Sequence, residues 1–222
     1  MKRRLRTYFP AFLNIERKKC VVVGGGQVAF RKVRMLLDCG ANVTVISPVL
    51  HPDLTELANR KSLQVIRRSY KLGDLKGALI VVAATDVKKV NRKVAMEAGR
   101  VGALVNVVDD PEPSDFIVPS FFRRGDLTVA VATAGRSPAL ARRIRTKLEQ
   151  SLGDEYGPLI ALINDARSSL KRQRITVRAE DWQAALDLDL LTHLVRAGHK
   201  EKAKAVLVEK LKRRVGETEQ LE

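Results

Sequence analysis

The chain has 222 residues, and its 41 Lys and Arg against 25 Asp and Glu give a formal net charge of +16. Since 45% of the residues are hydrophobic, the composition excludes a disordered chain and indicates one large or two modest globular domains. No apolar run approaches the roughly 20 residues needed to cross a bilayer, and the first residues lack the apolar centre of a secretion signal. We therefore expect a cytoplasmic protein that is not bound to a membrane.

The positive charge indicates an anionic ligand, although a solvated basic surface is the simpler explanation for the C-terminal part. Aromatic residues make up only 5% of the chain and form no stripe of the kind that stacks on RNA bases. The two cysteines and three histidines lack the spacing of a disulfide framework or a metal site. We expect no nucleic-acid partner and no bound metal, and charge alone does not identify the anion.

Strand-like and helix-like stretches alternate through the first part of the chain. Short β-branched runs predict strands, and the amphipathic stretches between them predict helices. This alternation is typical of an α/β fold, and we predict a Rossmann-like parallel sheet in a dinucleotide-binding domain over residues 1–115. The strands are expected at 20–23, 42–46, 64–68, 78–83 and 103–108, and the helices at 28–38, 53–61 and 87–99.

The pattern changes after residue 115. Two extended runs, 116–122 and 127–133, are separated by four turn-forming residues and predict a β-hairpin. Ser137 followed by Pro138 predicts the start of a helix over 139–151, with Ser137 as its N-cap. We assign 116–151 to a second region and 152–222 to a helical C-terminal domain, with helices at 156–171, about 180–196 and 199–214 and a frayed end at 216–222.

A glycine-rich loop lies between the first predicted strand and helix. Residues 21–29 read VVVGGGQVA and contain the pattern G-x-G-x-x-A. Gly24 allows a tight turn, and Gly26 lets the backbone approach a pyrophosphate, which the N–H groups of the following helix would bind. We therefore predict a dinucleotide site on this loop, with a merely flexible turn as the alternative.

The end of the second predicted strand does not identify the dinucleotide. A carboxylate there would bind the ribose 2′-hydroxyl of NAD, and an Arg would bind the 2′-phosphate of NADP. The sequence offers only Ser47, with its hydroxyl, followed by Pro48 and Val49. The residues by themselves leave the choice between NAD and NADP open.

Polar residues follow the fourth and fifth predicted strands. Because open α/β sheets bind ligands at the carboxyl ends of their strands, we take Thr85 as a cofactor contact and Asn106 as a substrate contact. Asp109 is placed to accept a proton from a substrate as a hydride leaves. The alternative for Asp109 is an ordinary turn residue whose side chain caps backbone N–H groups.

Five tracts occur in the order found in a known family. They are YFPAFL at 8–13, GGGQVAFRKVRMLLDCGANVTVISP at 24–48, AATD at 83–86, NVVDDPEPSDFIVPS at 106–120 and TAGRSPALARRIR at 133–145. Together they resemble precorrin-2 dehydrogenases, the NAD-linked part of siroheme synthases, over about residues 8–150.

The resemblance implies oxidation of precorrin-2 to sirohydrochlorin with NAD as cofactor, in siroheme biosynthesis. Asp109 takes the position of the family's catalytic aspartate, where it acts as a base or positions the substrate. Some members also insert Fe²⁺ or Co²⁺, so a bifunctional dehydrogenase and ferrochelatase is an alternative. By the same carry-over, Gln27, Val28, Pro48 and Val49 contact the dinucleotide, and 116–151 form the dimerisation region of a homodimer.

The implied substrate also accounts for the positive charge, because precorrin-2 is a polycarboxylate that a basic cleft would attract. The best local anion site is the start of the predicted helix 139–151, where a helix N-terminus, a cap hydroxyl and guanidinium groups meet. In the simpler interpretation Ser137 is only an N-cap and the arginines face solvent. We expect Arg31, Lys32 and Arg34 to be surface charges. The candidate substrate contacts are Arg136, Ser137, Arg142 and Arg143.

A function of a different class also fits a glycine loop on a basic chain. The protein would then be a non-catalytic regulator that senses NAD and binds nucleic acid. Salt-sensitive binding of DNA or RNA, without oxidation of precorrin-2, would distinguish this alternative.

Overall fold

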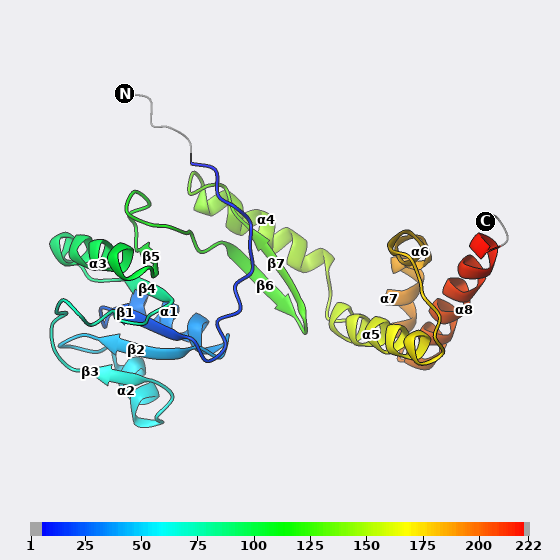
Figure 1. Ribbon diagram of the computed structural model, residues 1–222, viewed down its shortest axis with the longest axis horizontal. Helices are drawn as coiled ribbons and strands as arrows, with labels where there is room; N and C mark the ends of the chain where they lie inside the picture. Colours follow the sequence, from blue (N-terminus) through cyan, green and yellow to red (C-terminus); the bar gives the residue numbers. More distant parts are fainter. Residues whose placement is uncertain (1–5, 220–222) are drawn as a thin grey trace. The chain divides into compact units, whose positions relative to one another are not determined.

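The computed structural model of the protein describes residues 6–219. The chain divides after Val118 into two compact units. Helices and strands are labelled in Figure 1.

The first unit is built on a five-stranded parallel sheet with the strand order β3-β2-β1-β4-β5 (Figure 1). Buried β-branched residues dominate its central strands, as expected for a sheet that is covered on both faces. The predicted Rossmann-like parallel sheet is confirmed. Its strands are β1 (Lys19–Val23), β2 (Asn42–Ile46), β3 (Gln64–Ile66), β4 (Ile80–Ala83) and β5 (Leu104–Val107), and its helices are α1 (Gln27–Leu37), α2 (Pro52–Asn59) and α3 (Lys88–Val101).

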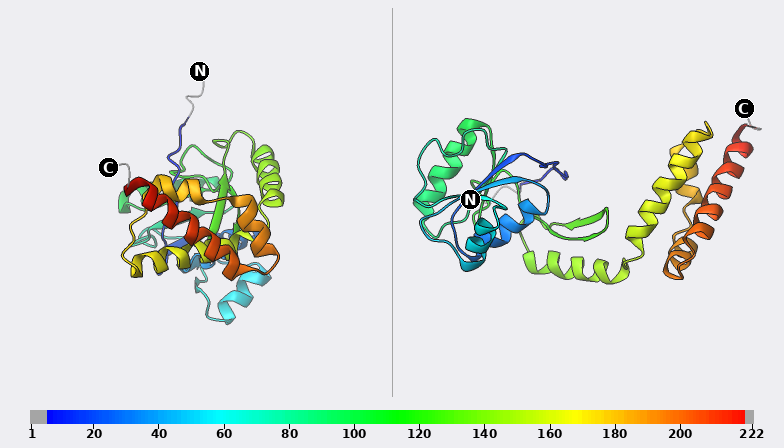
Figure 2. Two further views of the ribbon diagram at one scale, coloured as in Figure 1. Left: turned by 90° about the vertical axis from the view of Figure 1, so that its right-hand side faces the viewer. Right: turned by 90° about the horizontal axis from the view of Figure 1, so that it is seen from below.

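Helices α1 and α2 pack on one face of the sheet and α3 packs on the other (Figure 2). The last residues of four strands, Val23, Ile46, Ala83 and Val107, are neighbours across the sheet. The four segments that follow therefore begin at one edge. This carboxyl edge carries the site residues that the sequence predicts in the first unit, except Asn106, which lies within β5 itself.

The second unit begins with the antiparallel hairpin of β6 (Ser120–Arg124) and β7 (Leu127–Val131), so the predicted hairpin is confirmed. Its turn contains Gly125, whose φ of 56° lies in the left-handed region that favours glycine. Helix α4 (Pro138–Ser151) packs against both strands of the hairpin.

Four helices complete the second unit: α5 (Tyr156–Arg172), α6 (Ala179–Ala185), α7 (Leu188–Arg196) and α8 (Lys200–Glu219). Leucines from α5, α7 and α8 form their shared core. The single helix predicted at about 180–196 is wrong, because the Asp187 carboxylate accepts a hydrogen bond from the N–H of Leu190 and starts a new helix. The frayed end is also wrong for 216–219, since α8 continues through Gly216, and 220–222 lie outside the described residues.

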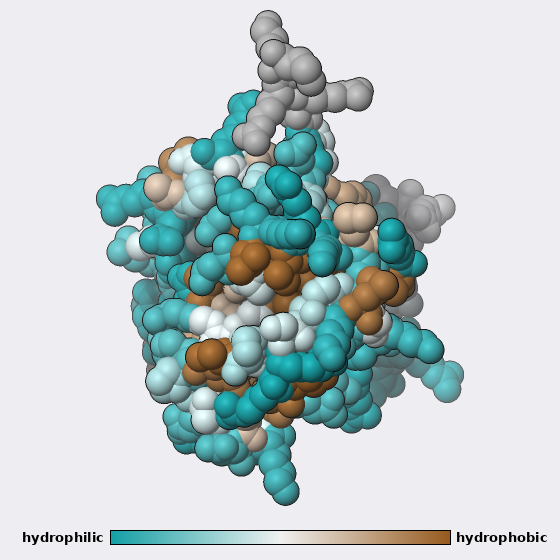
Figure 3. All heavy atoms as spheres, turned by 90° about the vertical axis from the view of Figure 1, so that its left-hand side faces the viewer, coloured by the Kyte–Doolittle hydropathy of each residue, from teal (hydrophilic) through white to brown (hydrophobic). Residues whose placement is uncertain are grey.

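The surface is mostly hydrophilic where it is drawn as spheres, with separate hydrophobic patches (Figure 3). Within residues 6–219, none of the helices has the length and apolar character that a bilayer span requires.

Candidate active site

The glycine loop approaches its neighbours too closely for any other residue at Gly24 and Gly25. At Gly24, φ is +123°, and an added Cβ would lie 2.2 Å from the carbonyl oxygen of Ala84. At Gly25, an added Cβ would lie 2.1 Å from the carbonyl oxygen of Val49. The loop is therefore held against the segments that follow β2 and β4.

Gly26 differs from these two glycines because it faces open space. An added Cβ would meet nothing within 4 Å, and its φ of −82° is ordinary for any residue. Gly26 is the N-cap of α1, and no side chain in the described part of the chain caps this helix. Among the described residues, the N–H groups of Gln27 and Val28 have no hydrogen-bond acceptor. This opening suits a pyrophosphate, which needs room beside the backbone and unpaired N–H donors.

The segment after β2 is fixed by its own hydrogen bonds. The buried Ser47 hydroxyl donates to the carbonyl of Val49 at 2.6 Å, and the N–H of His51 donates to the carbonyl of Gly25 at 2.7 Å. Pro48 and Val49 are exposed, and Val49 is 75% exposed. Of the three residues predicted here, Ser47 shapes the loop, whereas Pro48 and Val49 present their side chains to solvent beside the glycine loop.

The segment after β4 is tied to helix α3. The Thr85 hydroxyl donates to Asn91 Oδ1 at 2.7 Å, and Asn91 Nδ2 donates back to the carbonyl of Thr85 at 2.8 Å. Asn91 is buried. The predicted cofactor contact Thr85 is thus held rigidly at the carboxyl edge by a partner that sequence reasoning missed.

Hydrogen bonds also hold the segment after β5. The buried Asn106 side chain donates to the carbonyl of Phe116 at 3.0 Å, the N–H of Val107 donates to Ser114 Oγ at 2.9 Å, and the N–H of Val105 donates to Asp115 Oδ2 at 2.9 Å. These contacts fold residues 108–116 back onto the strand. The predicted substrate contact Asn106 is therefore engaged inside the first unit.

Asp109 lies at the bend of this segment and keeps its carboxylate free of hydrogen bonds to other described residues. Its φ of 58° is left-handed, which is uncommon outside glycine and often found at functional sites. The side chain is exposed. The capping role considered for Asp109 belongs instead to Asp110, whose Oδ1 accepts from the N–H of Glu112 at 3.3 Å.

Lys32 on α1 is, like Asn91, a residue of this site that the sequence did not reveal. Its side chain is half-buried, so the expectation of a surface charge is wrong for Lys32, whereas Arg31 and Arg34 are exposed. Burial lowers the pKa of the Lys32 ammonium, repulsion from Arg31 lowers it further, and attraction by Asp109 partly offsets both. This attraction places a positive charge near the Asp109 carboxylate.

The remaining predicted residues belong to the second unit. Ser137 is the N-cap of α4: its hydroxyl accepts from the N–H of Leu140 at 3.3 Å, and its own N–H donates to Thr133 Oγ1 at 3.0 Å. The predicted N-cap is confirmed. Arg136, Arg142 and Arg143 are exposed and have no carboxylate partner in the described part of the chain. The start of α4 is therefore a positively charged helix N-terminus.

Metal ligands do not gather anywhere in residues 6–219. No three side chains of His, Cys, Asp or Glu in that range lie close enough together to hold an ion.

Comparisons with known proteins agree with this geometry. Residues 11–120 match the family model described as putative NAD(P)-binding, and 124–151 match the model for the central region of a sirohaem biosynthesis protein. The siroheme synthase of Chromobacterium violaceum is 42% identical over 182 residues, or 81% of this chain, and siroheme synthase 1 of Aeromonas salmonicida is 39% identical over 198 residues, or 88%. Over most of its own length, the chain is therefore similar to siroheme synthases.

The chain is shorter than these curated siroheme synthases. It spans 39% of the Chromobacterium protein and 42% of the Aeromonas protein. The solved structure of SirC, a precorrin-2 dehydrogenase, matches with a TM-score of 0.69 over 93% of this chain and 100% of SirC. At 23% identity this match shows a shared fold.

Proposed function

We propose that the protein is a precorrin-2 dehydrogenase that oxidises precorrin-2 to sirohydrochlorin with NAD⁺. The observation that carries the proposal is the pairing, on one sheet edge, of an open phosphate-binding turn at Gly26 with an uncommitted carboxylate at Asp109. A dinucleotide site and a proton acceptor are what a hydride-removing enzyme needs. The similarity to siroheme synthases supports the choice of substrate.

The chain's own residues would divide the work as follows. The N–H groups of Gln27 and Val28 bind the pyrophosphate, and the exposed Pro48 and Val49 lie beside the nucleotide. NAD⁺ supplies the hydride acceptor when bound. The Asp109 carboxylate then holds the proton that leaves the substrate.

Charge and assembly complete the proposal. In the second unit, the exposed Arg136, Arg142 and Arg143 would attract the carboxylates of the substrate, with Ser137 at the helix N-terminus as a further contact. Residues 116–151 would form the interface of a homodimer. The enzyme would work in the cytoplasm, without nucleic acid as a partner.

The test is an anaerobic incubation of the purified protein with enzymatically made precorrin-2 and either NAD⁺ or NADP⁺. We expect the sirohydrochlorin spectrum to appear together with reduced cofactor, faster with NAD⁺. Addition of Fe²⁺ or Co²⁺ afterwards measures any metal insertion in the same sample. If the protein oxidised no precorrin-2 under any of these conditions and bound DNA in a salt-sensitive way, the proposed enzyme activity would be wrong and the regulator would be the better assignment.

A further inference from the structure

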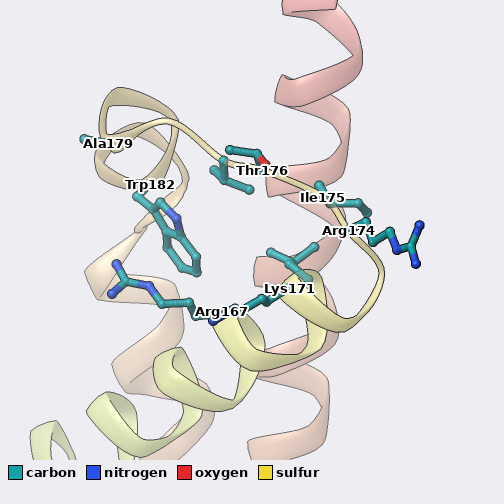
Figure 4. Close-up of a pocket in the computed structure, with 9 residues that line it drawn as sticks. Arg167, Lys171, Arg174, Ile175, Thr176, Ala179 and Trp182 are labelled. Carbon is teal, nitrogen blue, oxygen red and sulfur yellow. The ribbon is translucent and has the colours of Figure 1, made fainter.

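A second candidate site lies in the C-terminal helices, apart from every residue assigned above. An open cavity of about 590 Å³ lies between the end of α5, the segment 173–178 and the start of α6 (Figure 4). Its lining includes Arg167, Lys171, Arg174, Thr176 and Trp182. The volume is that of a site for a small organic molecule.

The cavity concentrates positive charge that the protein leaves uncompensated. Arg167 and Lys171 stand four residues apart, which places them on one side of α5, and Arg174 follows just after the helix end. None of the three has a carboxylate within ion-pair distance among the described residues, although other cations of this unit do. Arg178 and Arg214 both pair with Asp181, and Lys210 pairs with Asp187.

An aromatic face lies beside this charge. The Arg167 guanidinium carbon is 5.2 Å from the centre of the Trp182 ring, and Figure 4 shows the two groups next to each other. Trp182 is half-buried and packs against the helical core, so its ring is held in place. A cation in the last turn of a helix interacts favourably with the helix dipole, which explains Lys171 at the end of α5. Arg167 lies one turn earlier, so the dipole does not explain its position against the indole. A fixed indole with a neighbouring guanidinium suits a flat conjugated ligand.

The backbone at Arg174 is the third observation. Its φ is +59°, and the N–H groups of Arg174 and Ile175 donate to the carbonyls of Lys171 and Leu170, both at 3.0 Å. This helix ending normally has glycine at the left-handed position. An arginine there carries a conformational cost, and its side chain, which extends away from Trp182 in Figure 4, places a cation at the outer edge of the cavity.

We propose that this cavity binds a flat, conjugated organic anion that carries two or more carboxylate or phosphate groups. The indole, with the Arg167 guanidinium over its ring, provides a flat cationic stacking surface, and Lys171 and Arg174 bind the anionic groups. Two sources share this chemistry, a tetrapyrrole polycarboxylate and a nucleotide. The inference does not depend on the proposed dehydrogenase activity.

The test uses the full chain and calorimetric titration with three probes: uroporphyrin, ATP and inorganic phosphate. The binding variant is Arg167→Ala/Lys171→Ala, and the control is Lys200→Ala/Lys202→Ala, which removes the same charge from exposed positions on α8. Trp182 is the only tryptophan, so a change in its fluorescence on addition of ATP shows that ATP binds near this residue. ATP does not absorb the emitted light and therefore does not disturb the measurement.

We expect uroporphyrin or ATP to lose at least about tenfold in affinity in the binding variant and less than about twofold in the control. The probe that loses affinity identifies the source. Arg174→Gly should raise the urea midpoint and weaken the same probe, because it removes the backbone cost and the charge together. Equal losses in both double variants, binding of both probes unchanged by them, or inorganic phosphate bound as tightly as the organic anions would overturn the proposal.

Discussion

Gly24 and Gly26 stand two residues apart in the same loop, yet the structure gives them different reasons to be glycine. The space beside Gly24 is filled by the Ala84 carbonyl, whereas no atom of residues 6–219 fills the space beside Gly26. One residue is therefore needed by the fold, and the other is free for a ligand to approach.

Gly26→Ala should leave the fold intact and weaken dinucleotide binding. Among the described residues the added methyl group meets nothing within 4 Å, and φ is ordinary. The less flexible unfolded chain favours Ala, whereas the N-cap position favours Gly, so the free energy of unfolding should change by less than about 1 kcal/mol. The methyl group would occupy the path of the pyrophosphate, and the Kd for NAD⁺ should rise at least about tenfold. Calorimetric titration with NAD⁺ and urea unfolding measure the two effects.

Gly24→Ala is the matched control, and we expect it to affect mainly the stability of the fold. Its Cβ collides with backbone at a φ that only glycine adopts easily, so we expect a loss of about 2–5 kcal/mol in unfolding free energy. If Gly26→Ala proved as destabilising as Gly24→Ala, or bound NAD⁺ like the wild type, the opening at Gly26 would not be the pyrophosphate site.

Lys32→Met should be at least as stable as the wild type at pH 7, because folding places a charged ammonium in a half-buried site. The folded-state pKa of Lys32 lies below its ordinary value of 10.5, so the unfolded chain binds more protons between these two values. Wild-type stability therefore rises with pH across that window, and the difference from the variant should shrink as the pH approaches 10.

Urea unfolding at pH 7 and pH 10 tests this, with Lys93→Met as the control, since Lys93 is exposed on α3. The expectation would be contradicted if Lys32→Met were less stable than the wild type at pH 7 by an amount that does not change with pH. Burial of the ammonium would then not lower the free energy of unfolding.

Among single residues, the sequence predicts best those whose role is local. The roles of Gly26 and the N-cap Ser137 follow from their immediate neighbours in the chain, whereas the close contact of Gly24 with Ala84 does not. Lys32 could not be predicted, because Asp109, which attracts its ammonium group, lies far away in the sequence. The hydrogen bond from Thr85 to Asn91 escaped for a different reason, since an Asn inside a helical stretch has no pattern of its own.

At the scale of single elements, the cap of α4 offers a direct test. Ser137→Ala removes the acceptor for the N–H of Leu140, and we expect a loss of about 1 kcal/mol in unfolding free energy. Ser151→Ala is the control at the other end of the helix, where an exposed hydroxyl donates to the carbonyl of Lys147, and it should change stability by less than about 0.5 kcal/mol.

The same variant separates the two interpretations of Ser137. A change in stability alone identifies an N-cap. An additional rise in the KM for precorrin-2, with the KM for NAD⁺ unchanged, would identify a substrate contact as well.

Whole elements follow the sequence closely where hydrophobic periodicity is regular. All five parallel strands, the hairpin and most helices lie where the patterns place them. The exception is 180–196, whose apolar residues keep a helical spacing across a real break. The N-cap Asp187 interrupts that helix. Because Leu and Asp alternate around this position, the sequence does not single out Asp187 as a cap.

At the scale of the whole molecule, the charge of +16 should control the capture of a polyanionic substrate. Raising NaCl from about 50 mM to about 500 mM shortens the screening length severalfold. We expect the KM for precorrin-2 to rise several-fold while kcat stays constant. The KM for NAD⁺, which carries far less charge, should change little and serves as the internal control. A KM for precorrin-2 that does not change with salt would show that the basic surface does not help to capture the substrate.

The most direct measurement concerns Asp109, compared with Asp86→Ala, which removes an exposed carboxylate from the same sheet edge. For Asp109→Ala we expect a Kd for NAD⁺ within about twofold of the wild type and a kcat for sirohydrochlorin formation at least about 100-fold lower. Asp86→Ala should match the wild type in both. Turnover of Asp109→Ala within a few-fold of the wild type would contradict the assignment of this carboxylate to the reaction.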